Sequence, residues 1–220
     1  MPCRFKISIA MVEQSLRAVQ KDFHHINDTL DMRREAMQDS IVENMLAGYR
    51  YVNRMIEKEI DPLRRTYLDH FLELNHIVLC GQEQQARGEY AGHLQATKKR
   101  FYEQEGFSIG HLLAWKNKHK NDSPWKRAAG VYIMLLSRPQ LFEEGNHRTG
   151  ALLMSYLLVN SGEPPFLLTV KNAKAYFDPS SLAKETNKDF LGKYYKLPKI
   201  KKKFAKFLKK EANHEILTEC

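Results

Sequence analysis

Residues 139–151 decide the fold, and they read Pro-Gln-Leu-Phe-Glu-Glu-Gly-Asn-His-Arg-Thr-Gly-Ala. Apolar residues recur at three- and four-residue steps on both sides of this stretch, which predicts one helix over residues 124–136 and another over residues 146–161. Gly145, between the two helices, can adopt backbone angles that other residues avoid. The pattern therefore indicates two apolar helices joined by a tight turn.

Such a turn can bind an anion. The first amides of a helix have no partners within the helix, and the helix dipole makes this end positive. Arg148, in the first turn of the second helix, adds charged donors suited to phosphate oxygens. The simpler alternative is a helix–turn–helix corner that binds nothing and leaves Glu143 and Glu144 solvated.

Residues 142–149, Phe-Glu-Glu-Gly-Asn-His-Arg-Thr, resemble the signature of Fic-domain proteins, His-x-Phe-x-(Asp/Glu)-Gly-Asn-Gly-Arg-x-x-Arg. That signature also lies between two core helices, and most of the family transfers AMP from ATP to a hydroxyl group of a protein. The resemblance implies a metal-binding carboxylate at Glu144 for Mg²⁺ and a core anchor at Phe142. It also implies nucleotide-binding positions at Gly145, Asn146, His147, Arg148 and Thr149.

Three positions depart from the family signature. Gln140 occupies the place of the catalytic histidine, and a glutamine amide has no group that takes up a proton at ordinary pH. His147 replaces the second glycine, and Ala151 replaces the second arginine. No residue is therefore assigned as catalytic with certainty, and AMP transfer is expected to be impaired.

Residues 39–44, Asp-Ser-Ile-Val-Glu-Asn, resemble the inhibitory pattern (Ser/Thr)-x-x-x-Glu-(Gly/Asn) of many Fic proteins at its last two positions. This makes Glu43 a candidate regulatory residue. In the family the glutamate pairs with the second arginine, which is Ala151 here. The alternative is that Ser40 caps its own helix and Glu43 completes a capping box.

Composition indicates an ordinary soluble globular protein, with 43% hydrophobic and 28% charged residues in a chain of 220. No apolar run has the length of a membrane span, and the N-terminus lacks the long apolar core of a secretion signal. The three cysteines, Cys3, Cys80 and Cys220, follow no ligand or pairing pattern. Reduced thiols and a cytoplasmic location are expected.

The net charge of +9 comes almost entirely from eight lysines in residues 196–210, a segment that contains no acid. The rest of the chain is nearly neutral, so nucleic acid is not an expected partner. The segment could form a basic amphipathic helix for an anionic membrane or nucleic acid. A terminal helix docked through its phenylalanines, with its lysines in water, is favoured because the segment has few apolar anchors and neither tryptophan nor arginine.

The expected fold class is mostly all-α, a Fic-like helical bundle with at most a short β-hairpin or extended segment. Residues 1–61 form N-terminal helices that include the inhibitory-like segment. Residues 62–195 form the core with its loop at 140–151, and residues 196–220 form the lysine-rich tail. Residues 166–169 are expected to be strand-like, and residues 178–180 to form a turn.

Three functions are compatible with these features. The first is a nucleotide-binding protein that takes up ATP with Mg²⁺ but transfers little or no AMP, and acts on an unknown target or regulatory protein. The second is an active transferase that moves AMP or another phosphate-linked group by altered chemistry. The third is a non-catalytic helical interaction module. The sequence leaves the oligomeric state open, a homo-oligomer included.

Overall fold

The computed structural model describes residues 4–103 and 105–220, and its fold is mostly α-helical, as predicted. The helices are α1 (Ile9–Lys21), α2 (Phe23–Thr29), α3 (Asp39–Glu57), α4 (Leu68–Cys80), α5 (Gln84–Glu89), α6 (Ala91–Glu103), α7 (Ile109–Lys118), α8 (Pro124–Leu136), α9 (Asn146–Val159), α10 (Ala173–Glu185) and α11 (Leu197–Lys210). Shorter turns of helix are η1 (Arg65–Tyr67), η2 (Gly192–Lys196) and η3 (His214–Ile216). Within the described ranges, no helix combines the length and apolar character needed to cross a bilayer.

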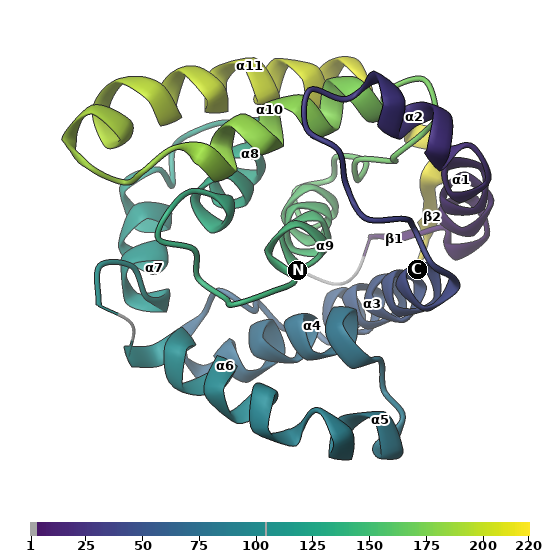
Figure 1. Ribbon diagram of the computed structural model, residues 1–220, viewed down its shortest axis with the longest axis horizontal. Coiled ribbons are helices and arrows are strands. Elements are labelled where there is room, and N and C mark those ends of the chain that lie inside the picture. The colour runs from purple at the N-terminus through teal and green to yellow at the C-terminus, as the bar shows by residue number, and fades with distance from the viewer. Residues whose placement is uncertain (1–3, 104) are drawn as a thin grey trace.

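Helix α9 lies at the centre of the molecule, with the other helices around it (Figure 1). It packs against α3, α4 and α8, while α11 and α10 cover α8, and α1 covers α3. Nearly every side chain from Leu152 to Val159 is buried, so α9 has no solvent-facing stripe. A helix that is apolar on all sides requires neighbours on all sides, and this explains its central position.

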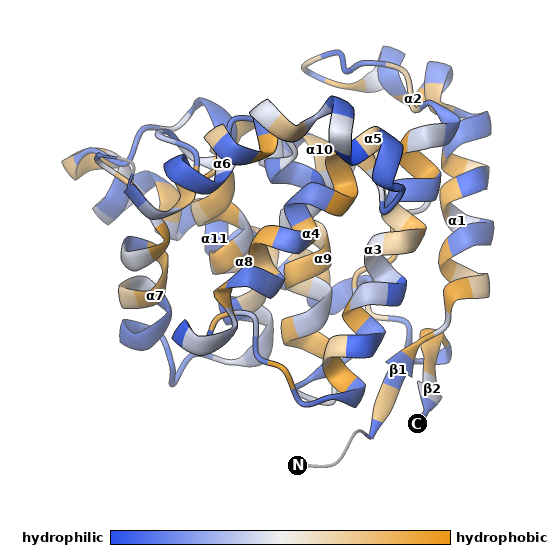
Figure 2. Cartoon of the chain, turned by 90° about the horizontal axis from the view of Figure 1, so that it is seen from below, coloured by the Kyte–Doolittle hydropathy of each residue, from blue (hydrophilic) through white to orange (hydrophobic). Residues whose placement is uncertain are grey.

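The outer helices are amphipathic instead. Figure 2 shows orange, apolar residues alternating with blue, polar ones along them. In α11 the buried residues include Leu197, Ile200, Phe204 and Leu208, which pack into the core. The apolar face of the lysine-rich segment is therefore used for docking on the domain, which is the arrangement favoured from the sequence.

The two strands lie at the ends of the described chain. Strand β1 (Phe5–Ile7) pairs antiparallel with β2 (Leu217–Glu219), and Lys6 lies opposite Thr218. Residues 166–169 were expected to be a short strand or a strand-like segment. They do not form a strand, because they have no strand partner among the described residues, and they are not helical either. A strand needs a neighbouring edge for its hydrogen bonds, and helices surround this segment.

The turn expected at residues 178–180 is also wrong, because Pro179 lies inside α10. Proline removes one helical hydrogen bond, which favours a helix end there. In this helix the Ser180 hydroxyl donates to the Phe177 carbonyl at 2.8 Å, and Tyr176 and Ala183 are buried on either side of the proline. Packing on both sides thus keeps the helix continuous.

The expectation of reduced thiols holds for Cys80, which is free and buried. It is wrong for Cys220, which is disulfide-bonded. Cys3 lies outside the described residues.

The contact between α8 and α9 depends on Gly150. A Cβ atom there would lie 2.8 Å from the Tyr132 ring, which is itself fully buried. We expect Gly150→Ala to lower the free energy of unfolding by about 1–3 kcal/mol, as overpacked cores do. Gly92→Ala in α6 is the matched control, because nothing lies within 4 Å of its Cβ position. Urea denaturation should show this control to be as stable as the parent or slightly more stable; equal destabilisation of both variants would contradict the packing argument.

Candidate functional site

The loop between α8 and α9 turns at Gly145, which has a left-handed backbone conformation with φ 74°. The Asn75 Nδ2 atom of α4 lies 2.9 Å from the position that a Cβ atom would take. Both the angle and the close approach require glycine here. This turn sets the direction in which α9 begins.

Asn75 holds the turn against α4. Its Nδ2 atom donates to the Glu144 carbonyl and to the Thr149 hydroxyl, each at 3.0 Å. Asn75 is fully buried, and it lies four residues after Phe71 on the apolar side of α4. Asn75 was not predicted as a site residue, although an asparagine on an otherwise apolar helix face was a usable signal.

Asn146 closes the loop from inside. Its Oδ1 atom accepts from the Phe142 backbone N–H at 3.0 Å, and its Nδ2 atom donates to the Phe142 carbonyl at 2.8 Å. Phe142 is buried and stacks on Phe101, with ring centroids 5.5 Å apart. In this arrangement the Asn146 side chain shapes the loop, while its backbone amide remains available to a ligand.

Gln140 is also used inside the loop. Its Nε2 atom donates to the Leu136 carbonyl at 2.8 Å, and its Oε1 atom accepts from Asn146 at 3.4 Å. Arg100 of α6 donates to the Gln140 carbonyl at 3.2 Å and pairs with the Glu143 carboxylate. Position 140 thus carries a side chain that stabilises the loop.

Lys188 supports the loop from the opposite side. Its Nζ atom donates to the Pro139 carbonyl at 2.5 Å and to the Ser137 carbonyl, and it lies 3.7 Å from the centre of the Phe107 ring. Lys188 is buried, and burial, followed by the charge of Lys193, lowers its pKa to about 7. The two carbonyls accept from its ammonium group and so compensate part of the cost of burying it. Neither Lys188 nor Arg100 was identified from the sequence, because both come from segments distant from the motif.

A cleft of about 710 Å³ opens above the loop and α9. Thr149 makes the first backbone hydrogen bond of α9, to the Gly145 carbonyl at 2.8 Å, so the amides of residues 146–148 have no helical partner. The predicted positions that line the cleft are Gln140, Glu144, Gly145, Asn146, His147, Arg148 and Ala151. Thr149 is not among them, because its hydroxyl is buried against Asn75.

The cleft has positive groups from three parts of the chain. Arg148 lines it and also donates to the Val78 carbonyl. Burial lowers the Arg148 pKa, and the nearby Glu144 and Glu35 carboxylates act in the opposite direction. Arg34, from the segment before α3, and Lys184 of α10 line the same cleft. An arginine stays protonated at any ordinary pH, so these side chains favour an anionic ligand.

His147 is neutral. Burial, followed by the charges of Arg34, Lys184 and Arg148, lowers its pKa to about 3. Its Nδ1 atom lies 3.2 Å from the Tyr132 hydroxyl, and its buried Nε2 atom has no hydrogen-bond partner. The imidazole is therefore not converted to the imidazolium near neutral pH.

Glu144 is exposed at the mouth of the cleft, and none of the described residues hydrogen-bonds or pairs with its carboxylate. The described residues contain no cluster of three or more acidic, histidine or cysteine side chains that could hold a metal alone. Mg²⁺ commonly binds through one or two carboxylates together with phosphate oxygens and water. Glu144 fits this role only when a phosphate ligand is bound.

Glu43 is not brought to this site. It lies on α3 but outside the cleft lining, and it pairs with Arg17 of α1. The alternative of a capping box is wrong, because α3 begins two residues earlier than a Ser40 cap requires, and Gln38 occupies its N-cap without a side-chain hydrogen bond. The acidic side chain that does line the cleft from this part of the chain is Glu35.

A β-hairpin flap, which Fic proteins place before the motif, would fall within residues 82–110. The described residues of this region form α5, α6 and the start of α7 instead. No strand lies in the described part of this region.

The loop with its glycine turn lies between two core helices, which is the arrangement that the motif resemblance implies. No family model matches the chain. It is 27% identical over 146 residues, 62% of its length, to protein adenylyltransferase fic-1 from Caenorhabditis elegans. The aligned part spans 27% of that relative. This similarity and the loop motif support a Fic domain in the chain.

A solved structure of a Fic domain containing signaling protein from Bacteroides thetaiotaomicron aligns with a TM-score of 0.49 at 15% identity. The alignment covers 93% of this chain and 92% of that one.

The depressed His147 pKa makes stability depend on pH. An unfolded histidine takes up a proton near pH 6.5, whereas His147 in the fold stays neutral down to about pH 3. Proton uptake by this histidine therefore stabilises the unfolded chain. As a result, the free energy of unfolding falls as the pH falls from 6.5 towards 3. We expect the free energy of unfolding of His147→Phe, measured by urea denaturation, to fall less steeply with pH over this range. The difference in slope should correspond to the uptake of up to one proton. Identical slopes for the parent and the variant would contradict the buried, neutral imidazole.

Proposed function

We propose that the protein binds ATP with Mg²⁺ in this cleft and transfers AMP poorly or not at all. The observation that carries the proposal is the start of α9. Its unpartnered amides and Arg148 face the cleft, while Gln140, in the position of the family's base, is hydrogen-bonded within the loop. The site thus has the groups that hold phosphates and lacks the group that accepts a proton.

Phosphate binding follows from the geometry of the turn. The amides of residues 146–148 provide donors from the backbone, and Arg148 can offer the donors that Val78 does not occupy. Arg34 and Lys184 add positive charge to a cleft in which Ala151 replaces the family's second arginine. We therefore propose a phosphate ligand held mainly by the turn and by Arg148.

The cleft also has apolar walls, which include Phe23, Phe166 and Phe177. Ligand pockets of several hundred cubic ångströms with a few polar groups and aromatic walls suit molecules that have an apolar part and a charged part. A nucleotide, with its planar base and its phosphates, has this character. The walls favour a nucleotide over inorganic phosphate alone.

Transfer of AMP requires that the attacking hydroxyl lose its proton. A glutamine amide does not take up this proton. His147 is the nearest imidazole in the sequence, but a pKa of about 3 makes it a weak base at neutral pH. Mg²⁺ bound by Glu144 and by the phosphates would neutralise phosphate charge, but it would not replace a base at position 140.

This chemistry supports a regulatory role in which the bound nucleotide alters how the domain binds a protein partner. The similarity to an adenylyltransferase covers about a quarter of that relative, so its activity is carried over only as a proposal.

Arg148→Ala should abolish ATP binding, because it removes the charged phosphate contact from the turn. We expect at least about a tenfold loss of affinity in calorimetric titration with ATP and Mg²⁺. Arg127→Ala is the matched control, since Arg127 on α8 is also partly buried but does not line the cleft. Equal affinities for the parent and both variants would place the nucleotide elsewhere. No binding by the parent would favour the helical interaction module.

Gln140→His should raise transfer of labelled AMP to a protein if the base is the missing element. The gain expected from a positioned general base is about a hundredfold or more. Gln140→His combined with Glu144→Ala should return to the parent's level, because the metal carboxylate is then absent. Strong transfer by the parent itself would favour the alternative of an active transferase with altered chemistry.

A further inference from the structure

The segment that joins α10 to α11 holds apolar side chains in water. Phe190, Leu191, Tyr194 and Tyr195 are 69%, 59%, 62% and 65% exposed. The Phe190 and Tyr194 rings lie against each other, with centroids 5.0 Å apart. We call these four residues the apolar cluster. Large apolar side chains grouped at this exposure usually mark a contact surface.

Local structure keeps the apolar cluster in this position. The Asp189 carboxylate accepts from the Gly192 backbone N–H at 2.7 Å, and the Asp189 carbonyl accepts from the Lys193 N–H at 2.9 Å. A Cβ atom on Gly192 would lie 1.7 Å from the Asn187 carbonyl oxygen, so the turn needs glycine to close this tightly. The turn that presents Phe190 and Leu191 is therefore built into the fold.

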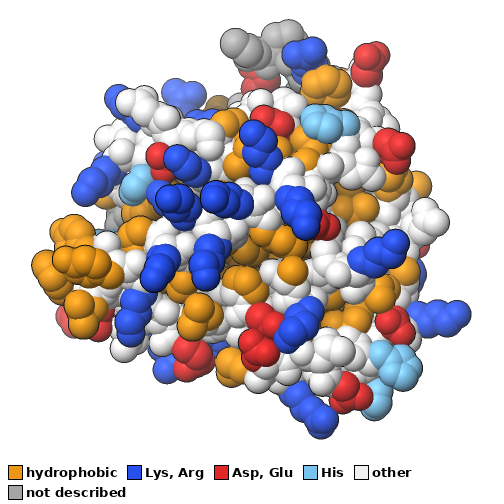
Figure 3. All heavy atoms as spheres, turned by 90° about the horizontal axis from the view of Figure 1, so that it is seen from above, with side chains coloured by type: hydrophobic (Ala, Val, Ile, Leu, Met, Phe, Trp, Pro, Cys, Tyr) orange, Lys and Arg blue, Asp and Glu red, His pale blue; other side chains and the backbone are white. Residues whose placement is uncertain are grey.

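A strongly basic surface adjoins the apolar cluster. Residues 190–210 contain no acid, and their exposed lysines are Lys193, Lys196, Lys199, Lys202, Lys203, Lys206, Lys209 and Lys210. None of these eight pairs with an acidic side chain among the described residues; Lys201, which is partly buried, pairs with Asp122 at 2.9 Å. Figure 3 looks onto this face and shows a band of lysines beside an apolar group at its edge. We call the eight lysines the lysine band.

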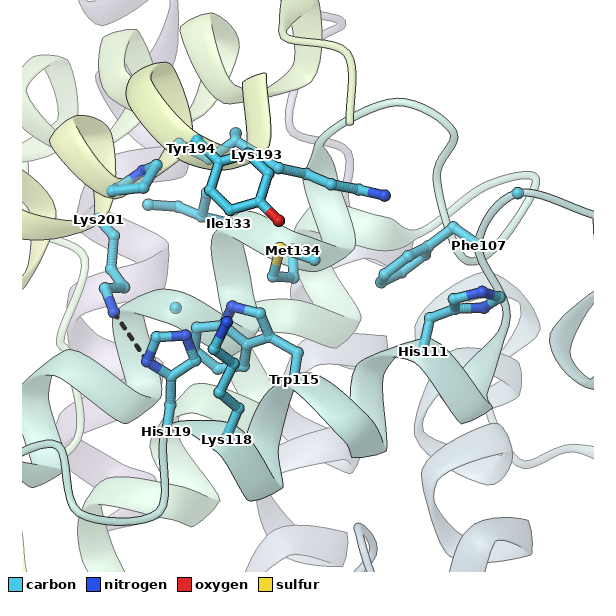
Figure 4. A pocket seen from close by; sticks show the side chains of 14 residues that line it. Phe107, His111, Trp115, Lys118, His119, Ile133, Met134, Lys193, Tyr194 and Lys201 are labelled. Carbon is cyan, nitrogen blue, oxygen red and sulfur yellow. Dashed lines mark hydrogen bonds between the residues drawn. The ribbon is translucent and has the colours of Figure 1, made fainter. Parts of the chain in front are cut away.

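A hollow of about 380 Å³ lies next to the cluster, between α7, α8 and the start of α11. Figure 4 shows Tyr194 and Lys193 above it, and Trp115 and His119 on its other side. Its lining includes three lysines and no acidic residue. A group with a negative charge and an apolar part fits such a lining.

We infer that this face docks on an anionic phospholipid membrane, with the apolar cluster inserted at the interface and the lysine band against the headgroups. Interfacial binding grows with the apolar area inserted and with attraction to anionic lipids, and both components are present here. The band alone would suit any polyanion, nucleic acid included. The adjoining apolar cluster favours a lipid surface, because a nucleic-acid backbone has no apolar layer to receive it.

The arrangement differs from an ordinary amphipathic membrane helix. The apolar face of α11 is buried in the protein core, so it is not free to enter a bilayer. The apolar contribution comes instead from the turn before the helix. The inference is independent of the proposed nucleotide site, because neither the cluster nor the band lines that cleft.

Vesicle flotation with the full chain tests this inference. We expect binding to vesicles of phosphatidylcholine with phosphatidylserine, little binding to phosphatidylcholine alone, and weaker binding at high salt. Phe190→Ser combined with Leu191→Ser, and separately Lys199→Glu combined with Lys203→Glu, should each reduce binding by about tenfold or more. The exposed positions of these residues should leave the fold intact, which circular dichroism and unchanged ATP titration would verify.

Lys98→Glu combined with Lys99→Glu is the matched control, with the same change of net charge on exposed residues of α6. In Figure 1, α6 lies at the opposite side of the molecule from α11. This variant should bind vesicles like the parent. The inference is overturned if the parent does not bind the anionic vesicles, if the control loses binding equally, or if the serine variant binds as well as the parent. In that last case the lysines alone would account for binding, as expected for a surface that binds any polyanion, nucleic acid included.

Discussion

The site depends on two buried asparagine side chains that hydrogen-bond the backbone of one loop. Asn146 binds both backbone groups of Phe142, and Asn75 binds the carbonyl of Glu144 next to the left-handed Gly145. Each such bond contributes only about 1 kcal/mol net, but a buried backbone group without a partner costs about 1–3 kcal/mol. Because these bonds satisfy the turn, α9 can begin at the cleft with its first amides free.

The charge distribution in the cleft follows from the same framework. Arg148 is part of the loop, whereas Arg34 and Lys184 reach the cleft from segments before and after it in the chain. Their charges and burial keep His147 neutral, with a pKa of about 3. An imidazole in that state cannot supply the base that Gln140 lacks. The cleft therefore combines positive side chains with a neutral imidazole.

Much of the helical framework was predictable, because helix periodicity depends on residues a few positions apart. The helices on either side of the loop and the docking of α11 through Phe204 agree with the pattern. The turn at Pro179 was wrong, and residues 166–169 do not pair as a strand, because each outcome depends on neighbours from other parts of the chain. The pairing of β1 with β2 and the loop contacts of Asn75 and Arg100 escaped prediction for the same reason.

By itself, the sequence determined the helical class and the position of the loop between two core helices, and it predicted that Gln140 stands where the family has its base. These follow from residue types and short-range spacing, which tertiary packing does not alter. Only the tertiary structure decided that Asn146 closes the loop, that Glu43 pairs away from the cleft and that Glu35 lines it. It also decided that Phe190 and Leu191 remain in water beside the lysines. The physical reason is that burial and hydrogen-bond partners depend on segments far apart in the chain.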